Sequence, residues 1–233
     1  MTSATETIGE AVLEARGIRK VYRRGTEELE VLSGVDLQVQ RGEVIAITGA
    51  SGVGKSTLLH ILGTLDRPTA GELSLHSVDV LNLDDDRLAE FRNRHIGFVF
   101  QFHNLLPEFT ALENVMLPAM IGRLPEAEVR EKAVNLLARV GLENRLSHRP
   151  GELSGGECQR VAVVRALIMS PLIVLADEPS GNLDARTSAA LHEMIIDLSR
   201  SERQTFMIMT HDQELASSLD RCGRIEAGIL YLN

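Results

Sequence analysis

Alternating and continuous apolar segments give the first indication of the fold. Residues 35–40 (VDLQVQ) alternate apolar and polar side chains, which is the period of a strand with one buried face. Three later runs are mostly apolar without alternation, namely 43–48 (EVIAIT), 171–176 (PLIVLA) and 205–210 (TFMIMT). Strands of a parallel sheet have this composition because both of their faces are covered. The pattern therefore predicts an α/β protein with an antiparallel region near the N-terminus and a parallel sheet after it.

Two segments have the period of amphipathic helices. Pro125 is expected at the first helical position of one helix, with acidic residues in the first turn and Gly141 as its end. Its apolar stripe consists of Val129, Ala133, Leu136, Leu137 and Val140. Asp184 is expected to cap the second helix. The apolar stripe of that helix consists of Leu191, Met194, Ile195 and Leu198.

The composition limits the kind of partner. The 233 residues include 24 Lys and Arg against 33 Asp and Glu, which gives a net charge of −9 at pH 7. A protein that binds mainly nucleic acid needs clustered cations to neutralise phosphates, so we expect no nucleic-acid partner. We interpret one basic run as a solvated rim near an anionic ligand. That run consists of Arg16, Arg19, Lys20, Arg23 and Arg24.

The cysteine content and the hydropathy of the chain indicate in which cellular compartment it is expected to act. The two cysteines, Cys158 and Cys222, are too few for a disulfide framework and suit a reducing compartment. We expect Cys158 to be a quiet, partly buried thiol. The N-terminal segment MTSATETIGEAVLEARG has neither a basic start nor an apolar centre, so we expect no signal peptide. No stretch reaches the roughly 18 apolar residues of a membrane-spanning helix, so any action at a membrane is expected from one side.

The segment GASGVGKST at 49–57 carries the most specific chemistry in the chain. It joins the run 43–48 to an apolar helical start, so that a glycine-rich turn and a helix N-terminus face an anion. In this pattern Lys55 reaches the β- and γ-phosphates of a nucleotide, and the Ser56 hydroxyl ligates Mg²⁺. We prefer nucleotide phosphate binding to a chance match. The predicted phosphate-binding residues are Gly49, Ala50, Ser51, Gly52, Val53, Gly54, Lys55, Ser56 and Thr57.

Two further motifs narrow the class of nucleotide-binding protein. The sequence LSGGECQR at 153–160 places a hydroxyl and two glycines before an apolar helical run. It is either a second anion site or a simple serine helix cap. The run LIVLADE at 172–178 ends in two carboxylates. Beside a phosphate-binding loop, Asp177 is placed to hold Mg²⁺ and Glu178 to polarise an attacking water, whereas an isolated pair would be a solvated acidic turn.

At these residues the chain resembles the nucleotide-binding subunits of ABC transporters, over nearly its full length. The matching motifs come in the family's order: Walker A at 49–57, the Q-loop at Gln101, the signature at 153–159, Walker B at 173–178, the D-loop at 180–184 (SGNLD) and the switch histidine at His211. Tyr22 matches the aromatic residue that stacks on adenine in this family, the alternative being an ordinary surface tyrosine. Cys158 in the signature and Ser180 in place of a common Thr depart from the family pattern.

The resemblance implies a fold and a set of site residues. The implied fold is a P-loop NTPase of the RecA-like type, with a parallel sheet core, an antiparallel N-terminal β region and an inserted α-helical subdomain. The core would consist of residues 1–100 and 165–233, and the subdomain of about 101–164. The implied catalytic residues are Glu178, His211 and Lys55. Nucleotide binding is implied for Tyr22, the 49–57 loop and Gln101, and Mg²⁺ binding for Ser56, Gln101 and Asp177.

The resemblance also implies partners. ABC subunits form a homodimer in the ATP-bound state, in which the signature of one subunit faces the γ-phosphate held by the other. The signature residues concerned are Ser154, Gly155, Gly156 and Glu157. A chromosome-maintenance ATPase of the SMC or Rad50 type also has a signature, but it needs a long heptad coiled coil between its Walker motifs, and no sustained heptad is present in this sequence.

Within the family, two strings are most similar to the lipoprotein-releasing ATPases: QFHNLLPEFTALENV at 101–115 and HRPGELSGGE at 148–157. This similarity implies that ATP-driven dimerisation powers integral membrane permease subunits that release lipoproteins from the bacterial inner membrane. The chain itself would then be a peripheral protein at the cytoplasmic face. Macrolide exporters of the MacB type and FtsE-like cell-division ATPases, which gate a membrane partner without transport, share parts of these strings and remain alternatives.

The few aromatic residues are unevenly distributed. Five of the six phenylalanines lie close to Gln101, at Phe91, Phe98, Phe100, Phe102 and Phe109. Packing inside the helical subdomain accounts for some of them. We also expect a groove for a cytoplasmic helix of the membrane partner, because exposed apolar patches mark interfaces. This docking interpretation requires that the five are not all buried.

Overall fold

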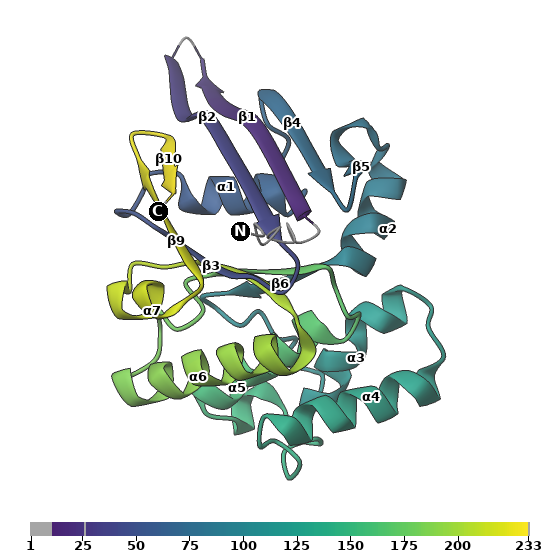
Figure 1. The fold of residues 1–233 in the computed structure, drawn as a ribbon. Helices are drawn as coiled ribbons and strands as arrows, with labels where there is room; N and C mark the ends of the chain where they lie inside the picture. The colour runs from purple at the N-terminus through teal and green to yellow at the C-terminus, as the bar shows by residue number, and fades with distance from the viewer. Residues whose placement is uncertain (1–10, 26, 233) are drawn as a thin grey trace, which may run out of the picture.

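The computed structural model describes residues 11–25 and 27–232, so the first ten residues, on which the signal-peptide expectation partly rests, lie outside the described residues. The elements follow in this order (Figure 1): β1 (Ala11–Arg24), β2 (Glu27–Gln40), β3 (Val44–Thr48), α1 (Lys55–Leu62), β4 (Ala70–Leu75), β5 (Val78–Asp79), η1 (Val80–Asn82), α2 (Asp85–His95), β6 (Ile96–Phe100), α3 (Ala111–Ile121), α4 (Glu126–Arg139), η2 (Pro150–Glu152), α5 (Gly155–Leu167), β7 (Ile173–Asp177), α6 (Ala185–Glu202), β8 (Thr205–Met209), α7 (Gln213–Ser218), β9 (Arg221–Glu226) and β10 (Ile229–Leu232).

Two sheets form the framework of the molecule. The first is antiparallel, with strand order β2-β1-β4-β5, and the second has the order β10-β9-β3-β8-β7-β6. In the second sheet β3, β6, β7, β8 and β9 run parallel, and β10 pairs antiparallel with β9 at the edge. Val35, Leu37 and Val39 of β2 are buried and alternate with exposed residues, as their pattern predicts. The predicted fold class is confirmed.

The carboxyl ends of the parallel strands bring the predicted site residues to one edge of the sheet. β3, β6, β7 and β8 lead into or end at the 49–57 loop, Gln101, Asp177, Glu178 and His211. The strands are in register at this edge, where Asp177 of β7 pairs with Phe100 of β6 and Met209 of β8. The sheet topology therefore makes neighbours of residues that are far apart in the sequence. The carboxyl ends of the strands are the usual place for a ligand in a parallel sheet.

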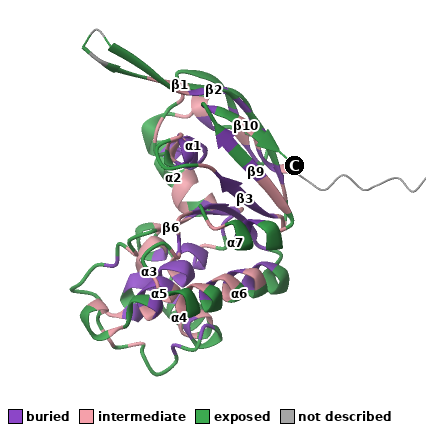
Figure 2. Ribbon diagram, turned by 90° about the vertical axis from the view of Figure 1, so that its left-hand side faces the viewer, coloured by how far each residue is buried: buried purple, intermediate pink, exposed green. Residues whose placement is uncertain are grey.

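Helices cover the parallel sheet on both faces and form two apolar cores. α1 lies between the two sheets (Figure 1) and buries Leu58, Leu59, Ile61 and Leu62 there. α3, α4, α5 and α6 pack on the other face, and Figure 2 shows buried positions where α3 and α5 meet. All residues of β3 and of β8 are buried, which confirms strands covered on both sides. β3 is thus packed against apolar side chains on both faces of the sheet.

The helix expected after Pro125 is α4, but it begins one residue later than predicted. Pro125 has an extended backbone, with φ −60° and ψ 122°, and is the N-cap rather than the first helical residue. The proline ring fixes φ alone, and this φ suits both conformations, so the sequence leaves ψ open. Gly141 ends the helix region with a positive φ of 73°. The buried members of the predicted stripe are Val129, Ala133, Leu137 and Val140.

The two helices that flank Walker B begin at polar caps. Asp184 accepts a hydrogen bond from the Thr187 backbone N–H at 3.0 Å and caps α6, as predicted. α5 begins at Gly155 itself, so the two signature glycines belong to its first turn and are not a flexible approach to the helix. α5 then continues without a break to Leu167 and links the helical layer to the strand β7.

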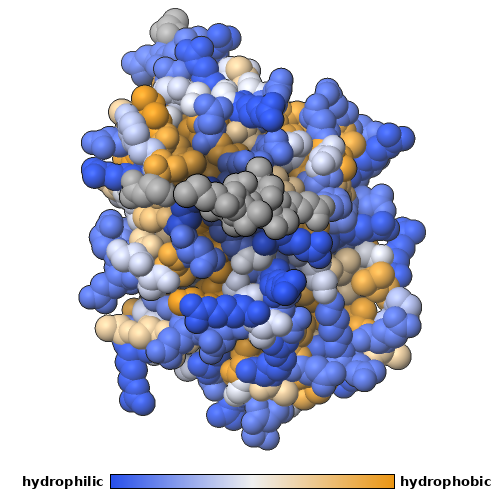
Figure 3. All heavy atoms as spheres, in the orientation of Figure 1, coloured by the Kyte–Doolittle hydropathy of each residue, from blue (hydrophilic) through white to orange (hydrophobic). Residues whose placement is uncertain are grey.

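The surface is mostly hydrophilic on the face shown in Figure 3, with apolar side chains in smaller areas. Within the part of the chain that the structure describes, no helix is long and apolar enough to cross a bilayer. The side chain of Arg24 lies outside the description. The other members of the basic run form ion pairs: Arg16 with Glu14, Arg19 with Glu30, Lys20 with Asp66 and Arg23 with Glu28.

Candidate active site

The 49–57 loop leaves β3 and turns directly into α1. Gly52 and Gly54 have positive φ angles of 80° and 108°, which L side chains rarely adopt. Gly54 is also the residue that caps α1, and a Cβ on it would lie 3.0 Å from a methyl carbon of Val31. The glycines at these two positions are therefore required by the backbone, and they set the tight strand-to-helix turn of a phosphate-binding loop.

The loop lines a cavity of about 400 Å³, a volume in the range of small-molecule sites. The cavity combines apolar and aromatic groups from β1 and β2 with a cation, hydroxyls and two carboxylates. It is lined by Tyr22, Leu29, Val31, Ser51, Gly52, Gly54, Lys55, Ser56, Thr57, Gln101, Asp177 and Glu178. The structure thus brings together most of the residues that the sequence predicts for nucleotide and Mg²⁺ binding.

Lys55 is held by backbone carbonyls of its own loop. Its Nζ donates to the carbonyl oxygens of Gly49 at 2.7 Å and Ala50 at 3.2 Å. The same nitrogen lies 3.7 Å from Oε1 of Glu178, and the Lys55 side chain is 9% exposed. An ammonium group this buried is stable because these oxygens surround it. Gly49 and Ala50 therefore orient Lys55, although they are not among the residues that line the cavity.

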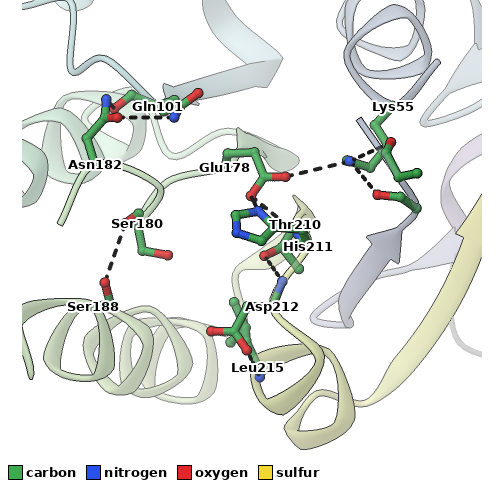
Figure 4. A network of polar contacts seen from close by, with 12 residues as sticks. Lys55, Gln101, Glu178, Ser180, Asn182, Ser188, Thr210, His211, Asp212 and Leu215 are labelled. Atoms are coloured by element: carbon green, nitrogen blue, oxygen red, sulfur yellow. Dashed lines mark hydrogen bonds and ion pairs between the residues drawn. The ribbon is translucent and has the colours of Figure 1, made fainter. Parts of the chain in front are cut away.

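Glu178 lies between a lysine and a histidine (Figure 4). Its Oε2 is 2.8 Å from Nδ1 of His211 and accepts a hydrogen bond from the His211 backbone N–H at 3.3 Å. The Glu178 side chain is 17% exposed, whereas that of His211 is 74% exposed. The carboxylate is therefore fixed on both sides at the edge of the cavity, with its histidine partner accessible from solvent.

The backbone of Glu178 is strained. Its φ is 46°, in the left-handed region that is unfavourable for a residue with a side chain. Two hydrogen bonds hold this conformation: the Glu178 N–H donates to the Met209 carbonyl at 2.9 Å, and the Glu178 carbonyl accepts from the Gly181 N–H at 2.9 Å. Sequence patterns do not reveal such a conformation, because it depends on the hydrogen bonds made with β8 and with the following turn.

Gln101 is tied to the segment that follows Walker B. Its Nε2 donates to Oδ1 of Asn182 at 3.1 Å, and Asn182 Nδ2 donates to the Gln101 carbonyl at 3.2 Å (Figure 4). A Cβ on Gly181 would lie 2.9 Å from Nε2 of Gln101, so glycine allows this close approach. The Q-loop and the D-loop are therefore directly coupled within one chain. The specific partner Asn182 could not be assigned from its motif alone.

Tyr22 is held at the cavity by two residues that the sequence did not connect with it. Its hydroxyl donates to Oδ2 of Asp66 at 3.1 Å, and Lys20 Nζ lies 4.9 Å from the centre of its ring. Lys20 also pairs with Asp66 at 2.7 Å. Burial raises the pKa of Asp66, but the hydrogen bonds from Lys20 and Tyr22 and the Lys20 charge outweigh it and lower the pKa below its ordinary value. The tyrosine ring is thereby fixed at the cavity wall.

The signature residues lie at the N-terminus of α5, away from this cavity. Ser154 is the N-cap: its Oγ accepts from the Glu157 N–H at 3.2 Å, and the Ser154 N–H donates to Glu157 Oε2 at 2.7 Å. The Ser154 backbone bond, followed by the bond from Arg145, lowers the pKa of Glu157. Gly156 is buried, and a Cβ on it would meet the Thr187 methyl group at 2.4 Å. The described residues that line the Lys55 cavity do not include 154–157.

Cys158 has the character expected from its sequence context. It is buried, and its Sγ lies 3.6 Å from the carbonyl oxygen of Pro150. Burial, and to a smaller extent the charge of Glu157, raise the pKa of the thiol. The thiolate fraction near neutral pH is therefore smaller than for a free cysteine, so the Cys158 thiol has low reactivity.

The phenylalanines near Gln101 are not all buried. Phe102 is 70% exposed and Phe109 is 38% exposed. Phe98 and Phe100 line a mainly apolar cavity of about 440 Å³ between α2, β6, α3 and α5. Phe91 is half-buried and packs against the core next to α1. The docking interpretation therefore keeps its physical support, while packing accounts for part of the cluster.

The parallel sheet, the phosphate-binding loop and the paired carboxylates define a P-loop nucleotide hydrolase, and residues 32–181 match the family model described as ABC transporter. The chain therefore belongs to the ABC transporter family and is an ATPase, as its motifs indicate. It is similar to the lipoprotein-releasing system ATP-binding protein LolD of Cytophaga hutchinsonii, with 53% identity over 219 residues that cover 94% of this chain and 98% of the relative. The LolD protein of Geobacter metallireducens is also 53% identical, over 218 residues that cover 94% and 97%.

Solved structures support the same family. A dimeric structure of MJ0796, a bacterial ABC transporter cassette, has a TM-score of 0.85 and 39% identity and covers 94% of this chain and 96% of that chain. A post-hydrolysis dimer of the same cassette bound to ADP and Pi has a TM-score of 0.86 and 38% identity, with coverage of 95% and 97%. These matches confirm the fold and the family that the sequence indicates.

Proposed function

We propose that this chain is the ATP-hydrolysing subunit of a lipoprotein-releasing ABC transporter, and that it acts as a peripheral protein at the cytoplasmic face of the bacterial inner membrane. The observation that supports the proposal best is that Glu178 lies between Lys55 and His211, in a chain 53% identical to LolD proteins over nearly its whole length. ATP hydrolysis rests on the family and on the site. Lipoprotein release rests on the similarity to these relatives.

The cavity suits ATP in one orientation. The adenine ring stacks on Tyr22, whose ring is fixed by Asp66 and Lys20. The phosphates lie in the 49–57 loop, where Lys55 exchanges its bonds to the Gly49 and Ala50 carbonyls for bonds to the β- and γ-phosphates. Because the loop is preformed and Lys55 is already largely buried, nucleotide binding requires little ordering of the loop and little further desolvation of the lysine.

The donor set at the same cavity suits Mg²⁺. Ser56, Gln101 and Asp177 all line the cavity and offer a hydroxyl, an amide oxygen and a carboxylate. Mg²⁺ takes oxygen ligands, uses few protein groups and keeps several waters or phosphate oxygens, so this small set is sufficient. When bound, Mg²⁺ neutralises negative charge on the nucleotide phosphates. We assign Ser56, Asp177 and Gln101 as the residues that hold it.

Glu178 accepts the proton of the attacking water, and His211 keeps the carboxylate in place. The 2.8 Å contact between His211 Nδ1 and Glu178 Oε2 fixes the carboxylate at the cavity edge. We propose that the exposed His211 side chain also contacts the γ-phosphate when ATP is bound. Positioning and electrostatics supply most of the rate in phosphoryl transfer, and a general base contributes about 10²- to 10⁴-fold.

The complete site requires two copies of the chain. Residues 154–157 do not line the Lys55 cavity of their own chain, yet they present a helix N-terminus with a serine and an exposed glycine. We propose that they contact the γ-phosphate held by a second copy in an ATP-bound homodimer. Two such sites close together, and loss of the γ-phosphate bridges on hydrolysis lets the dimer reopen.

The membrane partner binds beside the Q-loop. The apolar cavity lined by Phe98 and Phe100 is suited to a short helix of integral permease subunits of the LolC/LolE type. The neighbouring loop is held in place: Arg165 donates to the carbonyls of His103 and Asn104 at 2.7 Å. We retain the division into a core, 1–100 and 165–233, and a helical subdomain of about 101–164. The partner site lies between these two parts.

Reconstitution tests the proposed function. The chain is purified with its LolC/LolE-type partners in proteoliposomes that carry a labelled lipoprotein, and ATP-dependent release to a soluble acceptor is measured. We expect release in the wild type and none in the Glu178→Gln variant. ATP hydrolysis without lipoprotein release would refute the lipoprotein assignment. Macrolide efflux from the same vesicles would then favour a MacB-type exporter, and activation of a cell-wall hydrolase an FtsE-like ATPase.

A further inference from the structure

A histidine outside the established motifs is bonded to the turn that follows Glu178. His192 lies on α6, is half-buried, and places its Nε2 2.8 Å from Oγ of Ser180. We propose that His192 is a positioning residue for ATP hydrolysis: it anchors Ser180 to α6 and thereby holds the turn that carries Glu178. This inference rests on the proposed role of Glu178.

The turn concerned is short and closed by its own hydrogen bonds. The Glu178 carbonyl accepts from the Gly181 N–H at 2.9 Å, and the Ser180 carbonyl accepts from the Leu183 N–H at 3.0 Å. Pro179, between Glu178 and Ser180, is buried and restricts the backbone. A displacement of Ser180 is therefore transmitted to Glu178 over two residues of stiff backbone.

Glu178 needs such an anchor because its own backbone is strained. A left-handed φ of 46° at a glutamate persists only where the surroundings hold it in place. β8 restrains the Glu178 N–H through the Met209 carbonyl. On the other side of the strained residue, the bond from His192 ties the turn to α6, and Ser188 of α6 adds a weaker 3.4 Å bond to the Ser180 carbonyl.

The same segment also reaches Gln101. Two residues after Ser180, Asn182 exchanges two hydrogen bonds with Gln101, at 3.1 and 3.2 Å. Glu178 and Gln101, two residues of the proposed ATP site, thus share one connecting segment. His192 attaches that segment to a helix whose face is buried in the core through Leu191 and Ile195. Through His192, α6 therefore supports the segment that carries Glu178 at the cavity edge.

The protonation state of His192 is compatible with its hydrogen bond to Ser180. Burial lowers its pKa, and the negative charge of Asp212 opposes this in part. The ring is therefore mainly neutral near pH 7, with one N–H and one free nitrogen lone pair. A serine hydroxyl both donates and accepts, so the bond forms with either tautomer. The ring does not face the Lys55 cavity, because His192 is not among the described residues that line it.

Four variants test the proposal, each assayed for kcat and for the KM of ATP. His192→Phe keeps a flat ring but has no partner for Ser180, and His192→Gln places an amide nitrogen near the position of Nε2. Ser180→Ala removes the other partner without changing α6, and the fourth variant combines Ser180→Ala with His192→Phe. Glu193→Gln, at the exposed neighbouring position of α6, is the matched control.

We expect His192→Phe and Ser180→Ala each to lower kcat about five- to tenfold, the effect of one lost hydrogen bond, with the KM of ATP changed less than about twofold. His192→Gln and Glu193→Gln should retain kcat within about twofold of the wild type. The double variant should be no slower than either single variant, because both remove the same bond.

Three results would overturn the proposal: wild-type kcat in Ser180→Ala, additive losses in the double variant, or a His192→Gln variant as slow as His192→Phe. If His192→Phe does not fold, Ser180→Ala and His192→Gln still decide the question. Wild-type turnover in Glu178→Gln would refute the proposed catalytic role of Glu178 instead, so the two failures are distinguishable.

Discussion

Oε2 of Glu178 lies 2.8 Å from Nδ1 of His211, although the two residues follow different strands of the sheet. β7 and β8 are parallel neighbours in register at this end, so the residues just past their last positions meet. Lys55, which follows β3, approaches the other carboxylate oxygen at 3.7 Å. The ends of three strands thus place a carboxylate, an imidazole and an ammonium group around one point at the sheet edge.

Replacing His211 by alanine should slow hydrolysis and leave folding intact. The His211 side chain is 74% exposed, so its removal costs little packing. Loss of one charge-assisted hydrogen bond that orients Glu178 should lower kcat about 10- to 100-fold. Steady-state ATPase assays measure the effect, and thermal unfolding checks the fold. Wild-type turnover in this variant would remove His211 from the mechanism.

Replacing Lys55 by alanine should weaken nucleotide binding itself. The variant removes the cation that is positioned to contact the phosphates and leaves Glu178 without its nearby positive charge. The dissociation constant for ATP should rise about 10- to 100-fold. Titration with a fluorescent ATP analogue measures it. Lys132→Met on α4 is the control and should bind as the wild type does; unchanged affinity in Lys55→Ala would contradict the assignment of the phosphate-binding loop.

The sequence predicts the strand ends well because period and composition report burial directly. The runs at 43–48, 171–176 and 205–210 become β3, β7 and β8, and a parallel sheet brings their carboxyl ends together. The start of α4 differs by one residue from the start that the sequence predicts, because a proline determines φ and not ψ. The local sequence pattern therefore predicts the helices and strands and the sheet edge at which the site residues meet. Its errors lie at the ends of these elements.

The sequence does not predict the contacts that hold the site residues in place. Ser180 and His192 are 12 positions apart, and Tyr22 and Asp66 are 44 apart. Neither pair has a period or a motif that connects its members, because their contact depends on how α6 and β1 lie in the folded chain. The left-handed backbone of Glu178 is likewise a result of tertiary hydrogen bonds.

Replacing Gly156 by alanine should destabilise the fold through a contact within the chain. The new Cβ would lie 2.4 Å from the methyl carbon of Thr187. Overpacking of this kind costs about 1–3 kcal/mol. Adding Thr187→Ser removes that methyl group and keeps the hydroxyl that donates to Asp184 at 2.6 Å. Chemical denaturation should show the loss in Gly156→Ala and its recovery in the double variant; equal stability of Gly156→Ala and the wild type would contradict the packing.

Acid should destabilise the wild type more than an Asp66→Asn variant. The pKa of Asp66 is lowered in the folded state, so its contribution to stability is present above the ordinary value of 3.8 and is lost as the pH falls through the lower folded value. The difference in unfolding free energy between the two proteins should therefore shrink below about pH 4. Urea unfolding at a series of pH values measures it. A difference that stays constant down to pH 2.5 would exclude this linkage.

ATP binding between two copies of the chain is the step on which the proposed mechanism depends. The most direct test is the mass of the Glu178→Gln variant by size-exclusion chromatography with light scattering, with and without ATP and Mg²⁺. Ser154→Asp is added in a second variant, because aspartate still caps α5 but places a negative charge at the proposed γ-phosphate contact. We expect Glu178→Gln to be a dimer with ATP and a monomer without it, and the double variant to be monomeric in both. A Glu178→Gln protein that binds ATP and remains monomeric, or a double variant that dimerises equally well, would refute ATP binding between two copies.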